Sequence, residues 1–439
     1  MNENKNSNPN FDFYSFNLAQ TDEKPTEQPT VTDKTIADNT TADSSAAPLT
    51  SEVESMSENE ASEAENASVS EDTPLGETAI ASGEPTEPQA TVTPVLYDYE
   101  PSRRQMKSAY NHLGWGLAII TIAWIAISSV LYALMALFAP EAAENGIIST
   151  LVGTLPLYVI CMPMLFLIIF SRPRALIEKK KLKFGHFMIL FFMAQALMMA
   201  GSMVGNNFMN ILSNITGIDF YNQLNDTMEL PVWFSGLLTV VLAPVFEELI
   251  FRKLLLDRML PHGEFAAIFV NGLLFGAFHG NFYQFFYAAL LGMLLSFVYA
   301  RTGKIHHCML IHMAVNFFGG VLPTILMNWA DYDTLMLLVE EFMNNPEGVE
   351  QLEVLGQHVM EHAGGTLGVL LFVFAQYALA ALGVVFFIIR RRKFVLKKTE
   401  EQLPARMGLR TAILNPGTIV ALAVCAYLFV NTLLSAVLV

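Results

Sequence analysis

The chain has 439 residues, of which 53% are hydrophobic and 15% are charged, and its formal net charge is −16. Residues 1–100 carry this acidity, with 21 Asp and Glu against three Lys, whereas the remainder is apolar and nearly neutral. Such a division excludes one uniform soluble domain, and we expect no nucleic-acid partner for so acidic a chain. The three cysteines lie in apolar segments, which indicates small buried hydrophobic residues rather than a disulfide framework: Cys161, Cys308 and Cys425.

The first predicted domain, residues 1–100, is a disordered acidic tail. It is rich in Ser, Thr, Glu, Ala, Asn and Pro, and it has too few large apolar residues to offset the entropy of ordering. Its one aromatic cluster, Phe11 to Phe16, is a hypothetical docking motif for an unknown partner. The opening residues lack the pattern of a secretory signal, so we expect the first internal span to drive membrane insertion.

From residue 111 onward, apolar runs of about 20 residues predict helices that cross roughly 30 Å of hydrocarbon. We therefore predict an all-α polytopic membrane bundle of eight to nine transmembrane helices. Residues 101–400 form its main domain, with a motif core at 230–320, and residues 401–439 add a C-terminal transmembrane helix. The candidate spans lie near 112–138, 147–170, 186–212, 233–259, 264–280, 282–300, 305–328, 366–390 and 412–437.

Basic residues occupy alternate loops, and this distribution predicts a cytoplasmic N-terminus. They precede the first span and follow the second, fourth, sixth and eighth, whereas the opposite loops are acidic or neutral. Nine spans then place the C-terminus outside, and we expect a multi-pass protein of the plasma membrane. Prominent among these basic residues are Arg103, Arg104, Arg172, Arg174, Arg258, Arg301, Lys304 and Arg390 to Lys393.

One predicted span contains Glu247, Glu248 and Arg252, and ionisable residues within a membrane indicate function. Adjacent helical residues point about 100° apart, so the two carboxylates face different directions. Glu248 and Arg252 have the i, i+4 spacing of an ion pair, which leaves Glu247 without a nearby partner and free for chemistry. The alternative is that both carboxylates only pack helices or lie above the membrane.

Two later spans supply further polar groups, His279 on one and His312 with Asn316 on the other. His312 and Asn316 are i and i+4, so both can point at one spot. An amide there can orient an imidazole or donate to a developing oxyanion, although it can also simply link helices, for about 0.6–2 kcal/mol. Together the three spans predict one hydrolytic site inside the bundle.

Three motifs therefore stand in order, Glu247-Glu248-x-x-x-Arg252, Phe275-x-x-x-His279 and His312-x-x-x-Asn316. This pattern resembles the CPBP family of CAAX prenyl proteases and bacteriocin-processing enzymes, also called the Abi family. The resemblance covers roughly residues 230–320. It implies an intramembrane endopeptidase that hydrolyses a peptide bond of a membrane-associated protein or peptide.

The resemblance also implies a role for each residue. Glu247 would act as general base on water, and His279 would orient that water or bind a metal. His312 and Asn316 would stabilise the oxyanion, with Glu248 and Arg252 supporting the site. Two mechanisms stay open: a glutamate-type mechanism, and a metalloprotease in which Glu247, His279 and His312 hold Zn²⁺ with one position free.

A second motif, His358-Val-Met-Glu-His362, matches the H-x-x-E-H pattern of inverted zincins. It lies in the acidic segment 329–364 and no third ligand is evident, so we interpret it as an amphipathic helix in a loop. His306 and His307 lie at a predicted membrane boundary and are interpreted as interfacial.

Two other classes of function compete with a protease. A non-proteolytic scaffold or bacteriocin-immunity protein could keep the fold, but it would not need Glu247, His279, His312 and Asn316 together. A transporter is disfavoured because the chain has no inverted repeat or paired interrupted spans.

Overall fold

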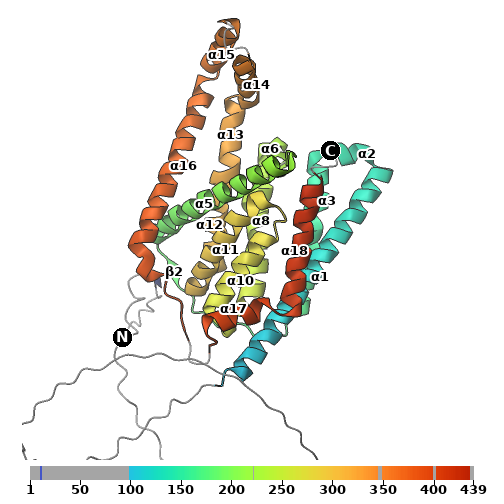
Figure 1. Cartoon of the computed structure of the whole chain (residues 1–439), viewed down its shortest axis with the longest axis vertical. Helices are drawn as coiled ribbons and strands as arrows, with labels where there is room; N and C mark the ends of the chain where they lie inside the picture. The colour runs from blue at the N-terminus through green and yellow to red at the C-terminus, as the bar shows by residue number, and fades with distance from the viewer. Residues whose placement is uncertain (1–9, 12–97, 221, 345–348, 399–401, 436–439) are drawn as a thin grey trace, which may run out of the picture. The chain divides into compact units, whose positions relative to one another are not determined.

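The computed structural model describes residues 10–11, 98–220, 222–344, 349–398 and 402–435. These residues are almost entirely helical, and the predicted all-α class is confirmed (Figure 1). The predicted disordered tail and most of its aromatic cluster lie outside the described residues. The described strands are β1 (Asn10–Phe11) and β2 (Lys181–Leu182), which pair in parallel.

Eight helical segments of the described chain are long and apolar enough to cross a membrane. Seven lie within four residues of the predicted ranges, whereas the first begins at Glu100 instead of near residue 112. Hydropathy detects only the part of a helix that lies in hydrocarbon. The first helix is longer because it begins with a charged portion, in which Glu100 pairs with Arg103 and Arg104. The segments are Glu100–Phe138, Gly146–Ile169, Phe184–Thr216, Val232–His262, Phe282–Thr302, Ile305–Trp329, Ala363–Lys393 and Pro416–Ser435.

Several spans are composed of more than one helix. The single helices are α1 (Glu100–Phe138), α5 (Phe184–Thr216), α11 (Phe282–Thr302) and α18 (Pro416–Ser435). The span Gly146–Ile169 consists of α3 (Gly146–Pro156), η2 (Leu157–Cys161) and α4 (Met162–Ile169), and the span Ile305–Trp329 consists of α12 (Ile305–Asn316), η6 (Phe317–Val321) and α13 (Leu322–Trp329). The span Val232–His262 consists of α7 (Val232–Gly236), η3 (Leu237–Leu242), α8 (Ala243–Glu248), η4 (Leu249–Leu256), α9 (Asp257–Met259) and η5 (Leu260–His262). The span Ala363–Lys393 consists of α16 (Ala363–Arg390) and η7 (Arg391–Lys393).

The predicted span near 264–280 needs correction. It is α10 (Glu264–Ala277), an apolar helix of 14 residues and about 21 Å, too short for a hydrocarbon core of roughly 30 Å. The remaining helices connect spans: α2 (Pro140–Glu144), α6 (Leu224–Glu229), α14 (Tyr332–Asn344), α15 (Val349–Glu361) and α17 (Ala405–Ile413). No membrane is present, so the predicted orientation stays a prediction.

Proline explains three of the four π-helical segments. η2, η3 and η6 each end two residues before a proline, namely Pro163, Pro244 and Pro323. A proline inside a helix cannot donate to the carbonyl four residues earlier, and its ring collides with that carbonyl. The backbone widens locally to a π-helix, a feature often found at functional sites. The two widened turns η3 and η6 lie on the spans that carry Glu247 and His312.

Small residues bring α10 and α11 into close contact. A Cβ atom added to Gly276 would lie 2.6 Å from the carbonyl oxygen of Phe285, and one added to Gly292 would lie 2.9 Å from the Phe275 ring. Glycine and alanine allow this approach of two membrane helices. The contact fixes the Phe275 ring and the Gly292 carbonyl beside α8 and η4.

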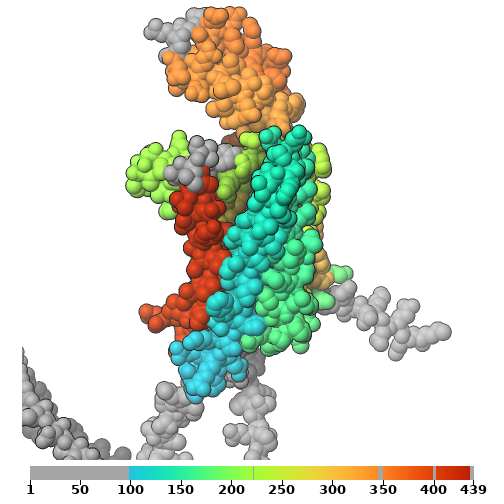
Figure 2. Space-filling view, turned by 90° about the vertical axis from the view of Figure 1, so that its right-hand side faces the viewer, coloured from blue at the N-terminus to red at the C-terminus, as the bar shows by residue number. Residues whose placement is uncertain are grey.

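The outer spans enclose this central group. In both views α18 lies alongside α1 (Figures 1 and 2), and α16 packs against α5. Beyond the spans, α14 and α15 form a hairpin between α13 and α16 (Figure 1). The three motif-bearing segments therefore lie at the centre of the bundle, where they contact one another.

We predict that Gly276→Val lowers the free energy of unfolding by about 1–3 kcal/mol, because the added methyl groups overfill the contact with α11. Thermal unfolding of the detergent-solubilised protein measures this. Gly185→Val is the matched control, since a Cβ at Gly185 meets nothing within 4 Å. Equal melting temperatures for the two variants would contradict the predicted packing.

Candidate active site

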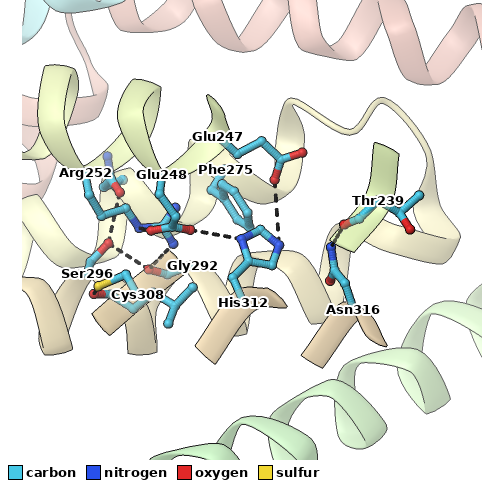
Figure 3. A network of polar contacts seen from close by, with 12 residues as sticks. Thr239, Glu247, Glu248, Arg252, Phe275, Gly292, Ser296, Cys308, His312 and Asn316 are labelled. Carbon is cyan, nitrogen blue, oxygen red and sulfur yellow. Dashed lines mark hydrogen bonds and ion pairs between the residues drawn. The ribbon is translucent and has the colours of Figure 1, made fainter. Parts of the chain in front are cut away.

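A buried ion pair forms the base of the site. Glu248 Oε2 lies 3.1 Å from Arg252 Nε, and both side chains are 0% exposed. The i, i+4 pairing predicted from the sequence is therefore present in the structure. The other carboxylate oxygen of Glu248, Oε1, lies 3.0 Å from Nδ1 of His312 on α12 (Figure 3). Glu248 thus links two spans through one carboxylate.

Neighbouring groups offset the charge of Arg252. Its guanidinium carbon lies 4.5 Å from the centroid of the Phe275 ring, a cation–π contact, and Nη2 donates to the Gly292 carbonyl oxygen at 3.3 Å. Ser296 Oγ lies 2.7 Å from the same carbonyl oxygen and 2.9 Å from Asn271 Oδ1. Asn271 Nδ2 in turn donates to the carbonyl oxygen of Phe251 at 2.8 Å. These contacts tie η4 to α10 and α11.

Glu247 differs from its neighbour. Its side chain is 19% exposed, and its Oε2 atom lies 3.8 Å from His312 Nε2. That separation exceeds a hydrogen bond, and Oε2 has no hydrogen-bond partner among the described residues. As predicted, Glu248 pairs with Arg252 on its own helix, whereas the nearest ionisable partner of Glu247 is His312 on another span (Figure 3).

His312 lies between the two carboxylates. A carboxylate only accepts hydrogen bonds, so Nδ1 donates to Glu248 and Nε2 faces Glu247. His312 therefore presents one ring nitrogen to each of the two carboxylates.

His279 and Asn316 are held by backbone carbonyls. His279 Nδ1 lies 2.9 Å from the Phe275 carbonyl oxygen, and the two rings meet edge to face with centroids 5.2 Å apart. The same Phe275 ring contacts His312 at 5.7 Å, so it lies against both imidazoles. Asn316 Nδ2 donates to the Thr239 carbonyl oxygen in η3 at 2.8 Å. Asn316 keeps a second N–H for another acceptor.

The predicted zinc ligands do not gather in this arrangement. Among the described residues, one group of His, Cys, Asp and Glu brings three ligand atoms within 4.8 Å of one another, and it consists of Asp331, His358 and His362. Glu247, His279 and His312 form no such group. The prediction of a zinc site at these residues stays a prediction, and the mechanism proposed below is written for their own side chains.

The H-x-x-E-H motif needs a correction on its ligands. Its predicted helix is present as α15, but the statement that no third ligand is evident is wrong, because Asp331 lies next to His358 and His362. Asp331 is 27 residues before His358 and belongs to the turn after α13, so helical spacing could not reveal it. The sequence also gave no signal for Thr239, Asn271 or Ser296, which act through tertiary contacts.

The fold and the site define a polytopic membrane protein with a buried, carboxylate-rich polar centre. Residues 229–318 match the family described as Type II CAAX prenyl endopeptidase Rce1-like, and the predicted resemblance is confirmed over this segment. The segment includes all three motifs. The eight apolar helices indicate an integral membrane protein, and residues 229–318 of it are similar to a CAAX-type endopeptidase family. Comparison with curated proteins and with solved structures gives no match.

We predict that Arg252→Met destabilises the protein by about 3–5 kcal/mol, because it leaves the Glu248 carboxylate buried without a counter-charge. Thermal unfolding measures the loss. Arg104→Met removes an exposed pair with Glu100 and should cost at most about 1 kcal/mol. Equal losses would show that the inner pair is solvated.

Proposed function

We propose that the protein is an intramembrane endopeptidase in which Glu247 is the general base. The observation that carries this proposal is the unequal treatment of two adjacent carboxylates. Glu248 is fully buried and lies 3.1 Å from Arg252, whereas Glu247 is 19% exposed and its nearest ionisable partner, His312, is 3.8 Å away. A base must reach water, and of the two only Glu247 retains solvent-exposed surface.

In the proposed reaction, Glu247 takes a proton from a water molecule as the water attacks the scissile carbonyl carbon. The carbonyl oxygen becomes an oxyanion, and the second N–H of Asn316 and a protonated His312 donate to it. His279 orients the water through the ring nitrogen that does not contact Phe275. As the C–N bond breaks, the proton that Glu247 took from the water passes to the leaving amine, which returns Glu247 and His312 to their starting states.

Glu248 and Arg252 position the reacting groups without touching substrate. Glu248 fixes the ring of His312 through Nδ1, and Arg252 supplies the counter-charge beside Glu248 in an apolar interior. The π-helical turn η3 supplies the Thr239 carbonyl that holds Asn316. The proposed substrate is a protein or peptide associated with the bilayer, and we propose a plasma-membrane location with a cytoplasmic N-terminus.

We predict that Glu247→Gln lowers peptide-bond cleavage by about 10²–10⁴-fold, because glutamine cannot accept the proton from water. Quantitative proteomics of membrane-associated peptides from cells with either form identifies substrates and measures their loss. Insertion and thermal stability should stay near those of the unaltered protein. Cleavage at the original rate by this variant would refute the assignment.

We predict that Asn316→Ala lowers the rate of cleavage by about 10²–10³-fold, as expected for loss of an oxyanion donor. Loss of its bond to Thr239 alone should cost only about 0.6–2 kcal/mol of stability. The rate is therefore compared with that of Thr324→Val, which removes a hydroxyl bonded to the Gly320 carbonyl on the same span. Equal rates for the two variants would assign Asn316 a purely structural role.

A further inference from the structure

The inverted-zincin motif, which the proposed protease mechanism does not use, lies at the end of two spans. Its first histidine, His358, is on α15, and His362 directly precedes α16. Asp331 is in the turn between α13 and α14. One ligand atom from each of these three residues lies within 4.8 Å of the others. From this convergence we propose a binding site for a divalent transition-metal ion of the Zn²⁺ class.

Tight backbone packing holds the two halves of this site together. A Cβ atom added to Gly365 in the first turn of α16 would lie 2.5 Å from the Cα atom of Ala330, and one added to Gly364 would lie 2.9 Å from the Trp329 ring. Ala330 directly precedes Asp331, and Gly364 and Gly365 closely follow His362. The position of the ligands is therefore fixed by the contact between α13 and α16.

The backbone at Asp331 also has an unusual conformation. Asp331 is the one non-glycine residue of the described chain with a positive φ, 43°. Aspartate tolerates this left-handed conformation better than most residues, and here it turns the chain from α13 into α14. Its carboxylate enters no hydrogen bond or ion pair among the described residues, so the carboxylate is available to a ligand.

A hydrogen bond orients His358 in the way expected of a metal ligand. Its Nε2 lies 3.3 Å from the Asp331 carbonyl oxygen, which can only accept, so Nε2 carries the proton and Nδ1 keeps its lone pair. Metal-binding histidines commonly donate their second ring N–H to a carbonyl in this manner. The His362 ring lies beside it, with the two centroids 4.7 Å apart.

The donor set selects the kind of ion. Two imidazoles and one carboxylate suit Zn²⁺ and similar transition metals, whereas Mg²⁺ and Ca²⁺ prefer oxygen ligands. Tetrahedral zinc bonds of about 2.1 Å place donor atoms about 3.4 Å apart, so small side-chain rotations complete the site. Three protein ligands leave a position for water, and we expect the ion to exchange with solution.

The three ligands flank the two ends of the segment that contains α14 and α15. Asp331 follows the span Ile305–Trp329, which also carries His312 and Asn316, and His362 precedes the span Ala363–Lys393. An ion held by both sides therefore joins the ends of these spans. The helices α14 and α15 lie beyond these span ends (Figure 1).

The test is a titration of the full-length, chelator-treated protein in detergent with ZnSO₄, followed by calorimetry and elemental analysis. We expect one bound zinc per chain, and affinity at least about 100-fold weaker in His358→Ala, His362→Ala and Asp331→Ala. His306→Ala, which alters a histidine outside the group, should bind as the unaltered protein does. MgCl₂ at the same concentrations should give no binding.

A second readout is hydrogen exchange of α14 and α15, which zinc should slow in the unaltered protein but not in His358→Ala. The absence of bound zinc would overturn the proposal. Zinc that survives in His358→Ala and His362→Ala but is lost in His279→Ala would place the ion at the catalytic residues instead. Glu247→Gln should bind zinc normally, so failure of the protease assignment and failure of the metal site give different results.

Discussion

The arrangement of the site depends on an ion pair that has no access to water. Placing Glu248 and Arg252 in an apolar interior costs several kcal/mol for each ion, and their mutual attraction offsets this only with further partners. Those partners come from three other elements: the His312 imidazole from α12, the Phe275 ring from α10 and the Gly292 carbonyl from α11. Because each partner belongs to a different helix, the two charges are stabilised only when these helices pack together.

The same interaction separates the roles of two adjacent acids. Glu248 is committed to Arg252 and His312, which leaves Glu247 beside the second nitrogen of the imidazole and partly exposed. In the proposed mechanism, Glu248 fixes the orientation of the His312 ring, and Glu247 acts as the general base beside that ring. A scaffold or immunity protein would have no use for this asymmetry, because two structural carboxylates would both gain from full pairing.

Much of this organisation could be predicted from the sequence. The spacing of Glu248 and Arg252 is local to one helix, so their pair followed from helical geometry, and hydropathy found eight spans. Hydropathy could not separate α10 from a full span, because apolar composition does not reveal that the helix ends at Ala277. The bond between Glu248 and His312 joins residues 64 positions apart, so only the assembled bundle reveals it. Asp331 was missed for the same reason.

The most direct test of the central interaction is a double-mutant cycle for unfolding with Glu248→Gln, His312→Ala and the variant that combines them. The two side chains lie 3.0 Å apart in a buried site, so their effects should not add. We predict an interaction free energy of about 1–3 kcal/mol, within the range for residues in one buried network. Effects that add to within about 0.5 kcal/mol would show that the two side chains act independently and would contradict the account.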